Sequence, residues 1–228
     1  MRRGLAAALI AGASFFLCAA AGATPFSVLL GPDRVLLDTP PGFSETAAFG
    51  SPRLTEIAEN LAEASSRVLA FALSDADARR FSVGDPLELR NYLLVVTPRA
   101  KERERMSSAQ YAFLMLEAGR NLGTPPPAPP DFMKYLQGRP PGQTHLLADL
   151  RRDPQVLSLL YGTMVPQPQS FWSSDKPPLF KLSTLTLVLI GGRAIYLYAF
   201  SAYDAPGDVS SIKSTTERWI EDLQRLNK

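Results

Sequence analysis

The side chains that most enzymes use for catalysis are scarce in this sequence. The 228 residues include one histidine, His145, and one cysteine, Cys18. A zinc site built from two or more histidines is therefore excluded, and a Ser-His-Asp hydrolase would have to use His145 as its base. No G-x-S-x-G sequence marks a nucleophilic serine for that base. We expect His145 to be a surface or capping residue; a hydrolase that uses it, or uses carboxylates scattered along the chain, is the alternative.

The acidic residues show no pattern that indicates a metal or cofactor site. Asp75 and Asp77 stand two positions apart, as the first two ligands of a calcium loop do. Ala78 and two arginines follow, whereas the calcium pattern requires further oxygen ligands and a glycine. The two acids suit the start of a helix, where the macrodipole favours negative charge. Phosphate-binding glycine motifs are also absent, so the sequence predicts no cofactor and no metal.

Several large aromatic side chains are candidates for binding a partner or a ligand rather than for catalysis. Phe171 and Trp172 lie in a loop between prolines, a setting typical of anchors for a protein partner. The alternative for this pair is packing over the edge or end of a sheet. Tyr196 and Tyr198 alternate with aliphatic residues on an expected strand, so both tyrosines share one face. That face either receives a ligand or packs under a helix.

Residues 1–23 have the three parts of a secretory signal peptide: two arginines near the start, an apolar run, and small residues at Ala21 and Ala23. We predict cleavage after Ala23, which removes Cys18 and leaves residues 24–228 without a thiol. Such a chain can form no disulfide and hold no metal through sulfur. The alternative is an uncleaved leader that tethers the protein, since about 20 apolar residues suffice to span a bilayer.

The charge balance argues against a nucleic-acid partner. The chain carries 24 Lys and Arg against 22 Asp and Glu, and the excess of two equals the two arginines of the leader. The remainder is formally neutral, without the one-signed footprint of a nucleic-acid binder. With 46% hydrophobic residues, the full chain can bury a substantial core. Residues 24–228 are therefore expected to form a single globular domain.

Hydrophobic periodicity and turn residues predict an α+β domain with a mainly antiparallel sheet of five or six strands and three longer helices. A Gly-Gly pair at 191–192 indicates a tight hairpin, and Trp219 lies in the apolar stripe of the last helix, for which Asp208 is the expected N-cap. The expected elements are a hairpin over 26–38, a helix over 52–61, strands over 67–73 and 91–97, a short helix after Ser74, a helix over 107–122, a hairpin over 180–203 and a helix over 208–226.

The segment 124–178 has a different character, because it holds twelve of the twenty prolines. Proline lacks the amide hydrogen that a sheet requires, so we expect an irregular insertion in extended polyproline conformation. Short helices are predicted within it at 132–137 and 155–161.

The strand leading into Pro41-Gly42-Phe43, the long antiparallel hairpin and the closing helix that carries Trp219 resemble the Mog1/PsbP-like α/β/α sandwich. This family recurs among small exported bacterial proteins. The resemblance covers about half of residues 24–228, and the proline-rich insertion departs from the family's compact layout. It implies the fold and assigns no functional residue.

These observations together predict an exported, non-catalytic accessory or binding protein of the bacterial envelope, periplasmic or secreted. The expected partner is an envelope protein or a small ligand. Contact with a membrane is expected only if the leader is retained, and the sequence indicates no oligomeric state.

Overall fold

The computed structural model describes residues 24–121, 125, 131–166 and 178–228, so the predicted leader lies outside the described part of the chain. These residues form nine strands, five α-helices and two single turns of 3-10 helix. The strands are β1 (Phe26–Leu30), β2 (Asp33–Leu37), β3 (Phe43–Glu45), β4 (Ser66–Ser74), β5 (Asn91–Pro98), β6 (Thr144–Asp153), β7 (Val156–Val165), β8 (Leu179–Ile190) and β9 (Arg193–Ala202). The helices are η1 (Ala47–Phe49), α1 (Pro52–Leu61), α2 (Asp75–Ser82), η2 (Arg99–Lys101), α3 (Ser108–Asn121), α4 (Phe132–Gln137) and α5 (Pro206–Leu226).

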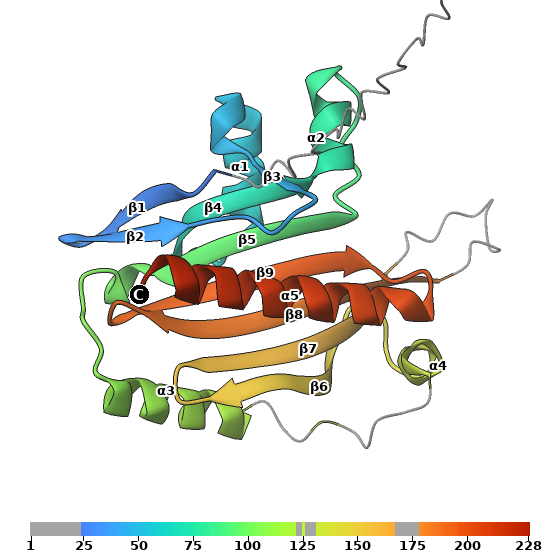
Figure 1. The fold of residues 1–228 in the computed structure, drawn as a ribbon. Coiled ribbons are helices and arrows are strands. Elements are labelled where there is room, and N and C mark those ends of the chain that lie inside the picture. Colours follow the sequence, from blue (N-terminus) through green and yellow to red (C-terminus); the bar gives the residue numbers. More distant parts are fainter. Residues whose placement is uncertain (1–23, 122–124, 126–130, 167–177) are drawn as a thin grey trace, which may run out of the picture.

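Seven strands form one antiparallel sheet in the order β3-β4-β5-β9-β8-β7-β6, while β1 and β2 pair separately as a hairpin (Figure 1). The predicted α+β class and mainly antiparallel sheet are confirmed. β4 and β5 lie inside the sheet, in agreement with their nearly continuous apolar sequences. Among the described helices, none is long and apolar enough to cross a membrane.

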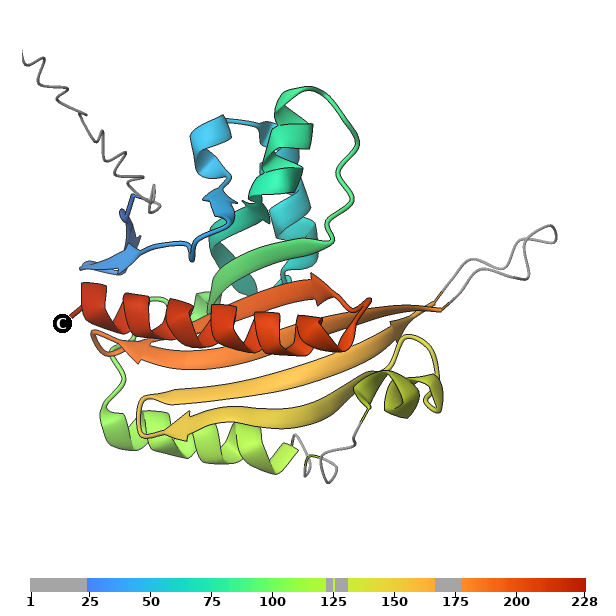
Figure 2. The same cartoon turned by 45° about the vertical axis from the view of Figure 1, so that its right-hand side comes forward.

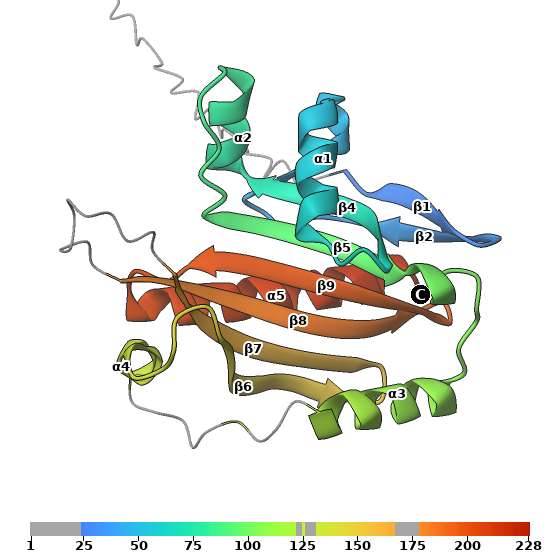
Figure 3. The same cartoon turned by 180° about the vertical axis from the view of Figure 1, so that it is seen from behind.

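Helices lie on both faces of the sheet. Figure 1 and Figure 2 show α5 lying across one face, over β8 and β9. Figure 3 shows the opposite face, where α1 lies over β4 and α3 lies at the far end, near β6 and β7. The result is the predicted α/β/α sandwich, with the middle of the second face, formed by β8 and β9, between α1 and α3.

The α5 face is sealed. Trp219 is only 1% exposed, as its place in the apolar stripe predicted, and its indole N–H donates to the Asp38 carbonyl at 2.8 Å. The hydroxyls of Thr184 and Thr216 form a buried hydrogen bond of 2.9 Å between β8 and α5. The polar atoms under α5 are thus paired, as burial requires.

The start of α5 differs from the prediction. Asp208 is not the N-cap, because Pro206 already occupies the first helical turn, where its fixed φ is favourable. The Asp208 carboxylate instead accepts hydrogen bonds from the amides of Asp204 and Ala205, both at 2.8 Å. It therefore stabilises the start of the helix from within its first turn.

The insertion is more regular than its composition suggests. The short helix α4 is confirmed, but the predicted helix at 155–161 is wrong, because these residues lie in the turn before β7 and in β7 itself. β6 and β7 form a hairpin of ten-residue strands. Neither strand contains a proline, and Pro154 occupies the turn between them. A short apolar run such as Val156 to Leu160 has no period that separates strand from helix, and the sheet decides it.

A glycine lets α4 approach β7. A Cβ atom built on Gly162 would lie 2.7 Å from Leu136 Cδ1 and 2.8 Å from Leu147 Cδ1. Leu136 fills that space and is fully buried. The absence of a side chain at this position is therefore what allows α4 to pack against the hairpin.

A buried arginine fastens the β1–β2 turn to the main sheet. Arg193, at the start of β9, is 2% exposed and donates from Nε and Nη2 to Asp33 Oδ2 at 3.0 and 2.5 Å. Arg105 also pairs with Asp33, and hydrogen bonds from the two guanidinium groups hold the pKa of this carboxyl well below its usual range. Since Arg193 also donates to the Glu102 carbonyl at 3.1 Å, one side chain joins three segments.

Candidate binding site

His145 is half-buried in a strand and is not the surface or capping residue that we expected. It lies in β6, with its ring edge-on to Tyr135 of α4 at a centroid distance of 6.4 Å. Its Nε2 atom is buried and has no hydrogen-bond partner in the described structure. Among the described residues, no hydrogen bond joins His145 to a serine or to a carboxylate.

The carboxylates of α2 have local structural roles. Asp77 is 4% exposed, and its amide donates to Ser74 Oγ at 3.2 Å, which is the predicted capping of the helix start. Asp75 accepts a hydrogen bond from Ser44 Oγ at 2.8 Å. Within the described ranges, no group of three or more His, Cys, Asp or Glu side chains could hold a metal ion.

Tyr196 and Tyr198 share the face of β9 opposite α5, as their alternation predicted, and both are half-buried. Tyr196 packs against clusters that include residues of α1 and of α3, so it lies between the two helices. Tyr198 packs only against the α1 side. The tyrosine face is thus flanked by helices rather than covered by one.

Further aromatic side chains extend this face. The ring of Phe200 stacks on Tyr92 at a centroid distance of 4.5 Å and lies nearly parallel to Tyr198 at 6.2 Å. Cross-strand pairing explains the order, because Tyr92 of β5 is the partner of Phe200, and Leu185 of β8 is the partner of Tyr198. The aromatic rings therefore come from β5 and β9, and β8 borders them with Leu185.

Lys181 places a positive charge at this surface. Its ammonium group lies 5.3 Å from the centroid of the Tyr92 ring and 5.8 Å from that of Phe200. The attraction between a cation and these ring faces holds the side chain in place. Burial lowers the pKa of Lys181, and the described part of the chain provides no carboxylate to form a salt bridge with it. An anion brought by a ligand would therefore gain a ready partner.

The hydroxyl groups of the face are also in a dry setting. Burial raises the pKa of Tyr198 to about 12, and the nearby negative charge of Glu63 adds to the effect. Burial likewise raises the pKa of Tyr196. Both phenols therefore stay neutral at physiological pH and can donate hydrogen bonds.

We call this surface the open aromatic face. Its residues lie on three adjacent strands, share the side opposite α5, and are all half-buried. No described helix lies over its middle in Figure 3. Its members are Tyr161, Lys181, Ser183, Leu185, Tyr196, Tyr198 and Phe200.

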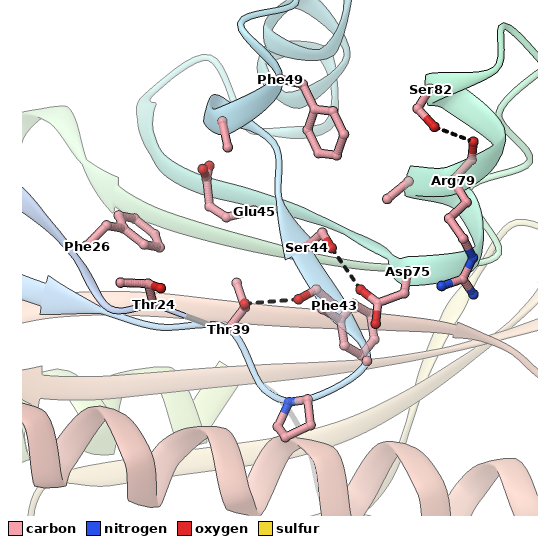
Figure 4. Close-up of a pocket in the computed structure, with 14 residues that line it drawn as sticks. Thr24, Phe26, Thr39, Phe43, Ser44, Glu45, Phe49, Asp75, Arg79 and Ser82 are labelled. Carbon is pink, nitrogen blue, oxygen red and sulfur yellow. Dashed lines mark hydrogen bonds between the residues drawn. The ribbon is translucent and has the colours of Figure 1, made fainter. Parts of the chain in front are cut away.

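A second candidate is a groove of about 760 Å³ at the β3 edge of the sheet (Figure 4). Phe26, Phe43 and Phe49, from three different elements, give it an apolar lining. Its volume falls in the range of small-molecule sites. Glu45 and Asp75 line the same groove.

The polar groups of the groove mostly bind within the protein. Ser44 donates to Asp75, and Thr39 Oγ1 donates to the Phe43 carbonyl at 3.1 Å (Figure 4). Glu45 Oε2 accepts from the Ala47 amide at 2.8 Å. These bonds fix the shape of the β3 edge. These polar groups of the groove therefore already have partners, whereas Lys181 on the open aromatic face has no carboxylate partner among the described residues.

Phe171 and Trp172, the other predicted anchors, lie outside the described residues. The structure therefore brings together only the tyrosine pair of the predicted site residues.

Comparison with known proteins identifies no family for this chain. No family model matches the chain, and no curated protein matches it. Among solved structures, the Ran-binding protein Mog1p of Saccharomyces cerevisiae is similar over 90% of this chain and 94% of that one, with 10% sequence identity and a TM-score of 0.38. A point mutant of Mog1 is similar over 89% and 94%, with 10% identity and a TM-score of 0.37.

Both structural neighbours are thus Mog1 proteins, which carry the name of the family that the sequence resembles, at very low sequence identity. A likeness at this level assigns no residue role and no partner to this chain.

Of the open aromatic face, only Tyr196 and Tyr198 were predicted from the sequence. Phe200 follows Tyr198 at the strand period of two, so the same alternation that selected the tyrosines includes it. Lys181 stands between Phe180 and Leu182 at the start of β8, which was also visible in the sequence. Tyr92 gave no such signal, because its place beside Phe200 depends on the pairing of β5 with β9.

Proposed function

We propose that the chain is an exported, non-catalytic binding protein that holds a protein partner on the open aromatic face. One observation carries the proposal: burial alternates along β8, with Lys181, Ser183 and Leu185 half-buried and their neighbours under α5 buried. Since both faces of a strand normally find cover in a sandwich, the half-covered side is the place for a partner.

The chemistry of the face suits a polypeptide. Tyr196, Tyr198 and Phe200 present large rings of low side-chain entropy, which are typical anchors in protein interfaces. Lys181 adds a cation without a carboxylate partner among the described side chains. The partner segment is therefore expected to place apolar side chains on the rings and an Asp or Glu beside Lys181.

The binding proposal is tested with a photo-crosslinking amino acid. It is placed at Tyr198, and at Ser214 on the exposed side of α5 as the matched control. A crosslinked product from position 198 alone is expected. Lys181→Glu should lower its yield about tenfold, which corresponds to about 1.4 kcal/mol, while Lys181→Arg should retain it. Equal crosslinking from both positions would overturn the proposal.

Export is the second part of the proposal. The N-terminal charge, the apolar run and the small residues at Ala21 and Ala23 support a cleaved leader and a periplasmic or secreted protein. Mass spectrometry of the protein recovered from cells is expected to show a chain that begins at Thr24. A mass that retains residues 1–23, together with sedimentation in the membrane fraction, would make the tethered form correct.

The loop aromatics stay a separate proposal. Replacing Phe171 and Trp172 together by alanine is expected to lower crosslinking of the partner more than it lowers the melting temperature, if both are anchors. A double variant that unfolds would assign them to the core.

A further inference from the structure

The helix α3 is apolar on two opposite sides. Its inner side faces the sheet, where Tyr111 is fully buried and its hydroxyl donates to the Leu187 carbonyl at 2.6 Å. Leu114 and Met115 pack against the same cluster. This side accounts for the attachment of α3 to β7, β8 and β9.

The outer side carries a second apolar row, which we call the outer stripe. Its residues Ala109, Ala112, Phe113 and Leu116 recur at i, i+3, i+4 and i+7, the spacing of one helix face, and all are exposed. Phe113 is 64% exposed and Leu116 is 52% exposed. A contiguous row of exposed apolar side chains on a helix commonly marks an interaction surface, so the outer stripe is expected to meet a partner.

A hollow of about 240 Å³ adjoins the outer stripe. It lies between α3 and the segment that leads into it, with Met106, Phe113 and Leu114 as its apolar lining. Lys101 and Glu104 stand at the same hollow. The exposed Phe113 side chain and the hollow that it lines therefore lie next to each other on one surface.

The charges around the hollow are balanced. Lys101 Nζ pairs with Glu104 Oε2 at 2.7 Å, and Arg105 pairs with Asp33 at 2.5 Å. Helices that bind a lipid surface instead surround their apolar stripe with unpaired cations. A protein surface that also offers both signs is the better complement to this rim.

We propose that the outer stripe is the contact surface of a homodimer, in which α3 packs antiparallel against α3 of a second copy. A two-fold interface needs one surface that complements itself, and here the projecting side chains, the hollow and both charge signs lie together. Ala109 and Ala112 are small enough for two helices to approach closely. Phe113 lies near the middle of α3 and hence near the two-fold axis of such a pair.

The dimer does not depend on the proposed function, because the outer stripe and the open aromatic face are different surfaces. Loss of one activity therefore leaves the other measurable.

The test is the mass of the purified protein in solution, measured by analytical ultracentrifugation from about 1 to about 100 µM. The mass is expected to rise from one chain to two over this range. Phe113→Asp should hold it at one chain at every concentration with an unchanged melting temperature, because the side chain is exposed. The matched control is Val83→Asp, which charges a 74% exposed apolar residue on a different surface and should leave dimerisation unchanged.

A second variant tests the same contact by chemistry. Cys18 is the only natural cysteine, so Ala112→Cys in the cleaved chain would carry one thiol, next to the predicted axis. Oxidation is expected to give a covalent dimer, and a thiol at Val83 is expected to give none.

Three results would overturn the proposal. The first is the mass of a single chain at every concentration, whether or not a different protein binds the outer stripe. The second is a dimer that Phe113→Asp leaves intact, and the third is binding to anionic vesicles that Phe113→Asp abolishes while the protein alone stays monomeric.

Discussion

The two faces of β8 differ in how far the rest of the protein covers them. Leu182, Thr184 and Thr186 face α5 and are at most 1% exposed. Lys181, Ser183 and Leu185 alternate with them and stay half-buried, because no described helix crosses the middle of their side. The chain thus covers one face of β8 and leaves the other half-covered, where we propose that a partner binds.

The difference has an energetic meaning. Under α5, each buried polar atom has a fixed partner, as the paired hydroxyls of Thr184 and Thr216 show. On the open aromatic face, the cation of Lys181 is held by ring faces rather than by a carboxylate. Substitutions under α5 should therefore change the free energy of unfolding, and those on the open aromatic face should mainly change binding.

The largest effect is expected at the centre of the sealed face. Trp219→Ala should lower the free energy of unfolding by about 3 to 5 kcal/mol, since a large cavity forms under α5. Urea denaturation followed by circular dichroism measures it. The neighbouring exposed Arg218→Ala is the control and should cost less than about 0.5 kcal/mol. Equal losses for the two variants would contradict the docking of α5.

Two leucines on the same strand test the comparison directly. Leu182→Ala, under α5, should cost about 2 to 5 kcal/mol because its surroundings are close-packed and fully buried. Leu185→Ala, on the open aromatic face, should cost about 1 kcal/mol, near the average for substitutions. The difference between the two urea midpoints is the measurement. A larger loss at Leu185 would mean that this face is covered.

Removing one hydroxyl of the buried Thr184–Thr216 pair should lower the free energy of unfolding by a smaller amount. Thr216→Val should cost about 1 to 3 kcal/mol, because it leaves the Thr184 hydroxyl buried without its partner. The double variant Thr184→Val and Thr216→Val should recover most of that loss, since neither polar group then remains. Additive losses in the double-mutant cycle would show that the hydrogen bond contributes little.

Local signals in the sequence predicted the elements that depend on neighbouring residues. The Gly191-Gly192 pair forms the expected hairpin turn with positive φ angles of 56° and 80°, and a Ser107–Gln110 capping box starts the helix expected over 107–122. The short edge strand β3 was missed, because three residues carry no periodicity. The β6–β7 hairpin was missed because proline content was averaged over a segment whose prolines stand outside its strands.

The candidate site, like the fold, was predictable only where it depends on residues close in sequence. Alternation within β9 placed Tyr196 and Tyr198 on one face. Which residues lie beside them depends on the pairing of β9 with β5 and β8, which local sequence does not encode. The Asp33–Arg193 pair, 160 positions apart, was beyond sequence patterns for the same reason.

Alkaline pH should act mainly on the second face. Burial raises the pKa of six of the seven tyrosines, including Tyr92 and Tyr161 to about 12. Between pH 10 and pH 12 the folded chain then binds more protons than the unfolded chain, so stability falls as pH rises. Lys181, with its lowered pKa, acts in the opposite direction but is a single group. Urea midpoints that stay constant above pH 10 would contradict these shifts.

The smallest effect is expected from a single hydroxyl group on the open aromatic face. Tyr198→Phe keeps the ring and its stacking with Phe200, so stability should change by less than about 0.5 kcal/mol. Because the substitution removes one donor and no aromatic surface, the affinity for the partner should fall by less than about tenfold. Tyr198→Ala removes the ring itself and should lose more than that while the melting temperature changes little. Titration of the identified partner against both variants measures the affinities. If Tyr198→Ala unfolds the protein, the ring is part of the core. If the variant binds the partner as tightly as the parent chain, the ring is not an anchor. Either result would contradict the difference between the two faces of the sheet.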